Sequence, residues 1–395
     1  MERSIYERLG VDPSKIEVKE IFEKVIDNEY RGAFVNIITD PYCFSRALTM
    51  HQDGDGSKFI QRLLHYFESG DEAIFTGMVD DALAMNTGDI AASGFVFGPW
   101  IITDVLNVNM PRELKNVVMK AVATRITELC KLYCQHGFQI KFLGGETADL
   151  PDQVRSGVFD ISITAWADKT DLITGNVQPG DVIFGFPSDG RAVWEAKENS
   201  GIMSNGLTMA RRELMSEKYN DKYPNLKREG DFYHGKFSYD DFPAELNGMT
   251  FSEALLSPTR QWPLVIKKII STLKAAEVLG MLHGISMNTG GGATKIANVG
   301  NNIHYIKDMP TPPPLFRIIQ ESSKEEWKNM YQSFNCGIGI DIVGVNHPIF
   351  IESLKKAAID CGLPLYRLGE CHIAPLWHDK KNKVSLNTPY GKFSY

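Results

Sequence analysis

The chain lacks the signatures of several large protein classes. It has no GxxxxGK[ST] phosphate loop and no GxGxxG turn after a strand, which argues against P-loop and dinucleotide-binding folds. Its 6 cysteines form no CxxC pair and no histidine pair has metal spacing, which argues against a zinc site. The longest uncharged stretch, 90–103, contains glycine and proline and is too short to cross a bilayer.

A basic excess and a secretory leader are also lacking. The 42 basic and 49 acidic side chains give a net charge of −7, which argues against nucleic-acid binding. The amino-terminal segment is charged and has no apolar core, so we expect no signal peptide. We interpret Cys130 and Cys134 as core thiols on a helix, and scattered free cysteines favour a cytoplasmic location.

Strand-like runs alternate with helical patterns, which predicts an α/β or α+β fold of two domains. Turn residues at 170–180 place the boundary there, giving domains 1–172 and 173–395. The charged, aromatic segment 217–243 is interpreted as a surface insertion. The predicted strands are 46–52, 138–145, 158–167, 181–188 and 338–345, and the predicted helices are 59–67, 111–134, 207–217 and 263–275.

Acidic residues beside glycines are the most informative motif. The segment DGDGSK, 53–58, lies between a predicted strand and helix, where glycines allow close backbone approach and the helix start favours anions. Its two carboxylates repel a phosphate unless a cation bridges them, and Mg²⁺ prefers carboxylates with phosphate oxygens. The segment therefore indicates a magnesium–phosphate site, with a plain acidic turn as the alternative.

Two further acidic segments follow. Asp81 and Asp89 are two turns apart on a predicted helix and share a side, and carboxylates in so apolar a helix need a partner. Capping by Asp89 is the alternative. The segment GGETAD, 144–149, is interpreted as a loop that places Glu146 at the carboxyl end of a strand, where α/β proteins bind ligands.

In the second half, small polar residues precede three predicted helices at 204–206, 256–260 and 289–292. Each helix start offers backbone N–H groups to a substrate phosphate, and Arg260 can add a bidentate contact. Ordinary helix caps are the alternative for any one of them. Gly337 and Gly339 are interpreted as strand glycines.

In this order, the strings YERLGVD, DGDGSK, AMNTGD, GGETADLPD, SNGLTMARREL, LLSPTR, TGGG, PPPLFRIIQ and MYQSFNCGIGI resemble the aminoimidazole ribonucleotide synthetase (phosphoribosylformylglycinamidine cyclo-ligase) family over nearly the whole chain. The resemblance implies two α/β domains, a mixed-sheet amino-terminal domain that forms a barrel shared in a homodimer, and an α/β carboxy-terminal domain. It also implies ATP and Mg²⁺ as cofactors and formylglycinamidine ribonucleotide as substrate. The amide oxygen is phosphorylated and ring closure then releases phosphate.

The resemblance also implies site residues. The metal ligands or their supports are Asp53, Asp81, Asp89 and Glu146. The catalytic residues are Asp89, Lys58 and Asn205. The nucleotide or substrate cradle comprises Asp53, Gly54, Gly56, Ser57, Lys58, Gly145, Glu146, Thr147, Ser204, Thr259, Arg260 and Gly291.

The chain departs from the family at several of these places. Met203 and Met287 stand where members often have histidine, and Gly88 stands where asparagine is usual. Methionine cannot shuttle a proton. Either His51 or His283 takes over acid–base or substrate contacts, or those histidines are dispensable.

Two other functions fit the sequence less well. A phosphotransferase or synthetase of the same superfamily would keep the fold and change the substrate. A non-catalytic nucleotide-binding paralogue would account for Met203 and Met287, but it would have no need of several costly acidic clusters.

Overall fold

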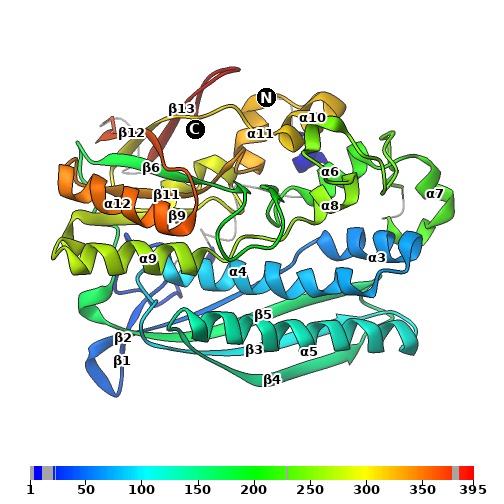
Figure 1. Cartoon of the computed structure of the whole chain (residues 1–395), viewed down its shortest axis with the longest axis horizontal. Helices are drawn as coiled ribbons and strands as arrows, with labels where there is room; N and C mark the ends of the chain where they lie inside the picture. Colours follow the sequence, from blue (N-terminus) through cyan, green and yellow to red (C-terminus); the bar gives the residue numbers. More distant parts are fainter. Residues whose placement is uncertain (1–3, 11–20, 23, 228–229, 376–381) are drawn as a thin grey trace.

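The computed structural model describes residues 4–10, 21–22, 24–227, 230–375 and 382–395. Two sheets dominate it (Figure 1). The first has five strands in the order β1-β2-β5-β3-β4, and β3–β4 is its parallel pair. Its strands are β1 (Ile38–Asp40), β2 (Cys43–Gly54), β3 (Pro99–Val108), β4 (Gln139–Asp149) and β5 (Gly157–Asp168).

The second sheet has seven strands in the order β14-β13-β10-β12-β6-β11-β9, and β10–β13 is its parallel pair. Its strands are β6 (Val182–Pro187), β9 (Leu282–Met287), β10 (Ile303–Asp308), β11 (Ile338–Gly344), β12 (Tyr366–Ile373), β13 (Lys383–Thr388) and β14 (Gly391–Ser394). The predicted α/β (α+β) class is therefore confirmed, with a mixed sheet in the amino-terminal half. The strands of the two sheets come from 38–168 and 182–394, while the domain division after residue 172 stays a prediction.

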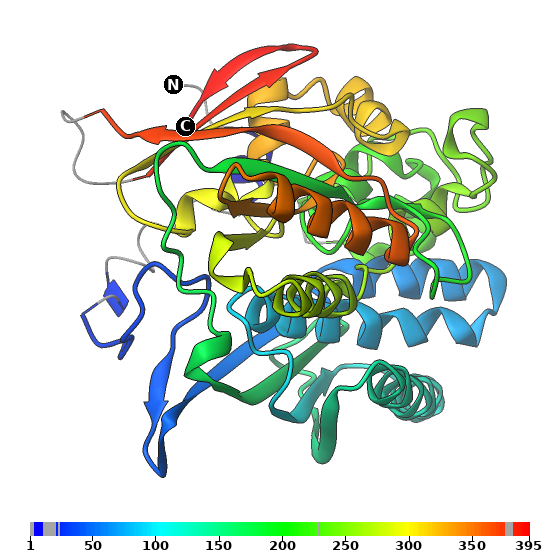
Figure 2. The same ribbon diagram turned by 60° about the vertical axis from the view of Figure 1, so that its left-hand side comes forward.

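Helices separate the sheets. In both views α4 (Gly77–Ala91) and α9 (Trp262–Ala275) lie between them, with α5 (Arg112–Gln135) and α3 (Lys58–Ser69) over the first sheet and α12 (Pro348–Cys361) on the second (Figures 1 and 2). From Met78 to Ala91 every residue of α4 is buried. A helix that is apolar and small on all sides needs such a central place. Any carboxylate on α4 is consequently buried too.

The segment 144–149 does not form the predicted loop. It continues β4 to Asp149 because it pairs in parallel with β3, with Glu146 opposite Val105. The other strands predicted for the first half, and the helices at 59–67 and 111–134, are confirmed by β2, β5, α3 and α5. In the second half β6, β11, α9 and α6 (Leu207–Leu214) confirm the predicted elements.

The segment 217–243 forms part of the wall of the molecule rather than a purely superficial insertion. It contains α7 (Lys218–Lys222) and docks on α3, where Glu68 pairs with Lys222 at 2.5 Å and accepts a hydrogen bond from Tyr223. Tyr219, Leu226 and Tyr233 are buried. The insertion is thus packed against the first half of the chain.

One face of the first sheet carries exposed apolar side chains. The β1–β2 hairpin projects from the molecule (Figure 2), and Tyr42 and Phe44 at its end are 97% and 82% exposed. Met50 on β2 and Leu143 on β4 are also largely exposed. Exposed apolar groups gathered on one sheet are typical of a protein–protein contact.

Within the described ranges, none of the helices has the length and apolar character needed to span a membrane. All six cysteines are free. Cys130 is half-buried and Cys134 is exposed, so the prediction of two core thiols on α5 is wrong for Cys134.

Candidate active site

The DGDGSK segment ends β2 and begins α3, where the two halves of the chain meet. Two of its glycines are required by geometry. A Cβ at Gly54 would lie 2.0 Å from Oδ1 of Asp160, and Gly56 has a left-handed backbone (φ 62°). From the second half, the Arg211 guanidinium donates to the Ser57 carbonyl at 2.9 Å, and Thr208 Oγ1 donates to Ser57 Oγ at 3.1 Å.

A buried ionic network centres on Asp81. Its carboxylate accepts from Lys58 Nζ at 2.9 Å, from Arg62 at 2.5 Å and from both N–H and Oγ1 of Thr259 at 2.7 Å. Lys58 also donates to the Ser257 carbonyl at 2.6 Å. Burial raises the pKa of Asp81, but the neighbouring cations and Thr259 outweigh it and leave the pKa below its usual value. The network therefore joins the two halves from the inside.

Asp89, two turns further along α4, has different surroundings. Its Oδ2 lies 3.5 Å from Nε2 of His51 and 3.6 Å from Nζ of Lys295, while Oδ1 is buried without a hydrogen-bond partner. Burial raises the pKa of Asp89, and the nearby charge of Asp53 acts in the same direction. A buried carboxylate with an unused oxygen is well suited to accept a proton, a ligand N–H or a cation.

The three glycine- and serine-rich segments of the second half approach one another above α4, with Thr259 bonded to Asp81 and Lys295 linking the third segment to Asp89. Ser204 Oγ lies 3.1 Å from Thr259 Oγ1, and a Cβ on Gly290 would lie 3.3 Å from Oδ1 of Asn205. The buried Nδ2 of Asn205 has no partner. Lys295 contacts Asp89 and also donates to Thr289 Oγ1 at 2.5 Å. Gly291, at φ 97°, starts a 3₁₀ helix, η6 (Gly292–Asn298), rather than the α-helix implied by the pattern.

The four predicted metal ligands are not gathered. Asp81 is saturated with protein donors, and Glu146 is an exposed residue of the edge strand β4. Because β3 and β5 separate β4 from β2, Glu146 lies three strand spacings, about 14 Å, from Gly54. Gly145 and Thr147 share this remote position. Within the ranges given above, no three His, Cys, Asp or Glu side chains are placed to hold a metal ion.

Lys58 and Arg260 are less accessible than their expected roles require. Lys58 is fully buried, and burial lowers its pKa to about 8. Arg260 is 2% exposed, and its guanidinium donates to Glu195 and to the carbonyls of Pro187, Asp189 and Gly190. Both cations therefore donate to protein carboxylates and carbonyls, and neither is exposed to a ligand in this structure.

Two further carboxylates belong to this region: Asp55, the second carboxylate of the DGDGSK segment, and Asp160, which the sequence did not single out. Asp55 is fully buried, neither of its oxygens has a hydrogen-bond partner, and Oδ2 lies 3.7 Å from Nε of Arg62; burial raises its pKa to about 8. Asp160 of β5 lies across Gly54, and burial and the charge of Asp53 raise its pKa. In the sequence, Asp160 is one polar residue of a strand in which polar and apolar side chains alternate, so nothing marked it as a ligand. No sequence motif marked Lys295 as a site residue, because only the folding of η6 brings it within reach of Asp89.

Two of the family departures are in contact. A Cβ added to Gly88 would lie 2.5 Å from Cε of Met287, so the buried methionine occupies the space that a side chain at position 88 would need. Met203, next to Ser204, has a left-handed backbone (φ 57°), which is uncommon for this residue type and typical of functional loops. Of the two histidines considered as replacements, His51 contacts Asp89, whereas His283 pairs with Asp181 at 2.7 Å.

Comparison with known proteins supports the resemblance that the motifs indicated. Residues 46–167 match the model of the family described as "AIR synthase related protein, N-terminal domain". A phosphoribosylformylglycinamidine cyclo-ligase of Methanococcus vannielii is 28% identical over 326 residues, which cover 82% of this chain and 77% of the relative. One from Saccharolobus solfataricus is 26% identical and covers 93% of both chains. The resemblance to this family of ligases is confirmed.

Solved structures show the same fold at low identity. T. maritima PurL complexed with FGAR matches 99% of this chain and 54% of its own, with 12% identity and a TM-score of 0.54. Hydrogenase maturation protein HypE in complex with ATP matches 98% of this chain and 94% of its own, with 15% identity and a TM-score of 0.50. A thiamine-monophosphate kinase of Stenotrophomonas maltophilia matches 96% of both chains, with 14% identity and a TM-score of 0.51.

Proposed function

We propose that this chain is an ATP-dependent cyclo-ligase that converts formylglycinamidine ribonucleotide into aminoimidazole ribonucleotide. The observation that carries the proposal is that the Ser204–Asn205, Thr259 and Thr289–Gly291 segments meet one another and are tied to the α4 carboxylates, Thr259 to Asp81 and Lys295 to Asp89. The chain that carries them resembles cyclo-ligases over most of its length. ATP transfers its γ-phosphoryl group to the amide oxygen and ADP leaves. The neighbouring nitrogen then attacks the amide carbon, loses a proton, and phosphate leaves.

The residues of the site supply what this chemistry needs. Phosphoryl transfer depends chiefly on positioning and on neutralising charge. The Asn205 amide and the backbone around Gly291 offer donors to phosphate oxygens, and Lys295 adds a cation between this loop and Asp89. Ser204 and Thr259 place two hydroxyl groups 3.1 Å apart beside Asp81. Lys58 and Arg260 have a supporting role: Lys58 holds Asp81 in position, and Arg260 holds the 187–190 backbone.

The carboxylates fit a role for Mg²⁺. Asp89 has a buried oxygen without a hydrogen-bond partner, and burial, together with the charge of Asp53, raises the pKa of both Asp89 and Asp160. Such mutual repulsion is relieved by a cation. When bound, Mg²⁺ neutralises the phosphate charge. We propose that Asp53 and Asp89 would hold it together with phosphate oxygens of ATP, with Asp81 as a structural residue, while Glu146 contributes only if another subunit brings it near.

His51 is proposed as the group that takes the proton lost in ring closure. Its Nδ1 lies 3.0 Å from Oδ1 of Asn86 and its Nε2 faces Asp89. His51→Gln is expected to lower kcat at least tenfold, since positioned acid–base groups contribute about 10²–10⁴-fold. The matched control, His283→Gln, is expected to stay within about twofold of wild type, because His283 lies at Asp181. Equal effects of the two substitutions on steady-state rates would remove His51 from the reaction.

Assembly and location complete the proposal. The exposed apolar side chains of the first sheet, with Phe44, Met50 and Leu143 among them, support a homodimer formed through this face. The six free cysteines support a cytoplasmic enzyme. We also propose that 1–172 and 173–395 are the two domains. No nucleic-acid or membrane partner is part of the proposal.

An altered substrate within the same fold is the second candidate. It is favoured by the Gly88–Met287 contact, which replaces polar groups beside Asp89 by a thioether. Mg²⁺-dependent ATP turnover separates the candidates, because a cyclo-ligase turns ATP over only when formylglycinamidine ribonucleotide is present. Turnover that requires a different acceptor would favour the related phosphotransferase, and binding of ATP without turnover would favour the non-catalytic paralogue.

A further inference from the structure

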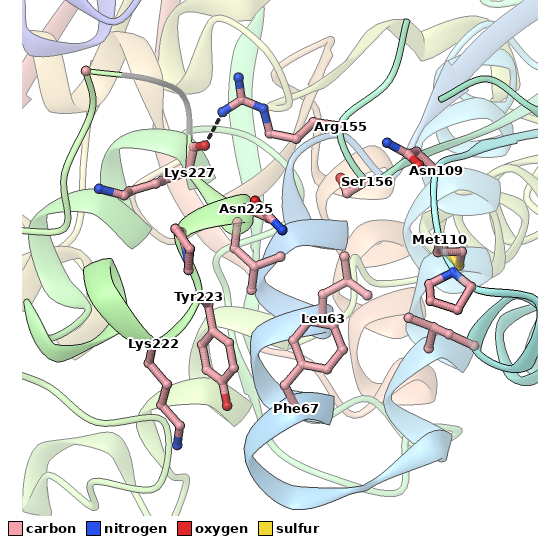
Figure 3. A pocket seen from close by; sticks show the side chains of 15 residues that line it. Leu63, Phe67, Asn109, Met110, Arg155, Ser156, Lys222, Tyr223, Asn225 and Lys227 are labelled. Carbon is pink, nitrogen blue, oxygen red and sulfur yellow. Dashed lines mark hydrogen bonds between the residues drawn. The ribbon is translucent and has the colours of Figure 1, made fainter. Parts of the chain in front are cut away.

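A second cavity lies away from Asp89, between α3, the start of α5 and the 222–227 segment (Figure 3). Its volume is about 940 Å³, within the range that holds small-molecule ligands. Leu63 and Phe67 of α3 face Met110 and Tyr223 across it. Phe67 is 43% exposed although it is a large apolar side chain. This lobe offers flat apolar surface to a ligand.

A smaller basic lobe adjoins it. This lobe, of about 390 Å³, shares Arg155, Leu226 and Lys227 with the apolar lobe and is closed by Ser57 and Arg211. Arg155 points toward the junction and donates to the Lys227 carbonyl (Figure 3). The two lobes are therefore adjacent, separated at the junction by the Arg155–Lys227 contact, and we call them together the double cavity; residues 222–227 form part of its wall.

Among the described residues, cations outnumber carboxylates in the lining of the double cavity. Asp231 is the acidic side chain among these lining residues, and it pairs with Arg212 at 2.9 Å. Arg155, Arg211 and Lys227 form no ion pair with a carboxylate in the described part of the chain. Three such cations around one small space favour an anionic ligand.

Arg211 gives the strongest indication. It is 7% exposed, its Nε has no hydrogen-bond partner, one terminal N–H donates to the Ser57 carbonyl, and Tyr233 and Asp231 are its neighbours. A buried guanidinium that forms no direct ion pair is costly unless a ligand supplies the charge. The lobe also lies at the first turn of α3, where no side chain caps the helix and the helix dipole is positive.

We propose that this double cavity binds a phosphomonoester that carries a flat apolar group, of the nucleoside monophosphate class. The phosphate lies in the basic lobe against Arg211, Arg155 and Lys227, and the flat group lies against Phe67 and Tyr223. A phosphate in the basic lobe satisfies the buried Arg211, and an aromatic body fills the apolar lobe. The proposal goes beyond the reaction at Asp89 and does not depend on it.

The test is calorimetric titration of AMP into the full chain saturated with Mg²⁺ and a non-hydrolysable ATP analogue. AMP is expected to bind, and adenosine, which lacks the phosphate, at least tenfold more weakly. Lys227→Glu and Tyr223→Ala are each expected to weaken AMP binding at least tenfold. Lys236→Glu, an exposed lysine of the same segment outside the cavity, is the matched control and is expected to bind as wild type.

Several outcomes would overturn the proposal. They are no AMP binding, AMP binding that the ATP analogue abolishes, or equal affinity in wild type and in the Lys227 and Tyr223 variants. Thermal unfolding verifies that each variant is folded, and the two substitutions are at separate positions of the wall, so misfolding of one leaves the other decisive. Competition by formylglycinamidine ribonucleotide would identify the substrate's own phosphate as the source, and its absence would identify a separate effector; both support the site.

Discussion

Asp89→Asn is expected to lower kcat by about 10²–10³-fold while the fold is kept. The reason is the place of the carboxylate, which is 5% exposed and faces His51 and Lys295 with one oxygen unused. Asparagine keeps the shape but loses the charge that is proposed to hold the metal and the phosphate-binding lysine. Steady-state ATP turnover with substrate measures the change.

The stability of this variant is expected to move in the opposite direction. Burial raises the folded-state pKa of Asp89, so ionisation costs stability as the pH rises above the unfolded-state pKa. At neutral pH the uncharged asparagine therefore leaves the free energy of unfolding equal or higher. Asp360→Asn, at a surface pair with Lys268, is the control and changes neither quantity much. A folded Asp89→Asn protein with near-normal rates would contradict the assignment.

Asp81→Asn is expected to lower the free energy of unfolding by about 3–5 kcal/mol, or to prevent folding. The substitution removes the carboxylate that Lys58 and Arg62 contact most closely and leaves these buried cations only the more distant Asp55 nearby. It also weakens the bonds to Thr259 that tie the two halves together. Denaturant unfolding followed by fluorescence measures the loss.

The neighbouring residue provides the matched control. Asp80 is also on α4 and also paired, but its partner Arg125 has a side chain that is 30% exposed and stays hydrated when the carboxylate is removed. Asp80→Asn is therefore expected to cost less than half as much. If the two variants were equally stable, the Asp81 network would not be the main link between the halves.

The sequence predicts the local elements of this protein well. The apolar spacing at 59–67 and the alanine-rich pattern around Asp81 and Asp89 each depend on a single helix, and α3 and α4 confirm them. It fails at 144–149, where glycines suggested a loop. Pairing with β3 extends β4 instead, and no local signal reports which strand a glycine-rich segment will pair with.

The candidate site is predictable in part for the same reason. Spacing alone placed Asp81 and Asp89 on one side of a helix. It did not reveal that Asp81 would meet Thr259, 178 positions away, or that Asp89 would meet Lys295. The contact between Gly88 and Met287 likewise exists only in the folded chain, although both positions were recognised as departures from the family.

Product formation tests the central claim most directly. The purified protein is incubated with Mg-ATP and formylglycinamidine ribonucleotide, and the aminoimidazole product is detected colorimetrically. We expect product and ADP in equal amounts, and neither when Mg²⁺ or the substrate is omitted. A folded protein that binds ATP but forms no aminoimidazole product under these conditions would contradict the proposed reaction.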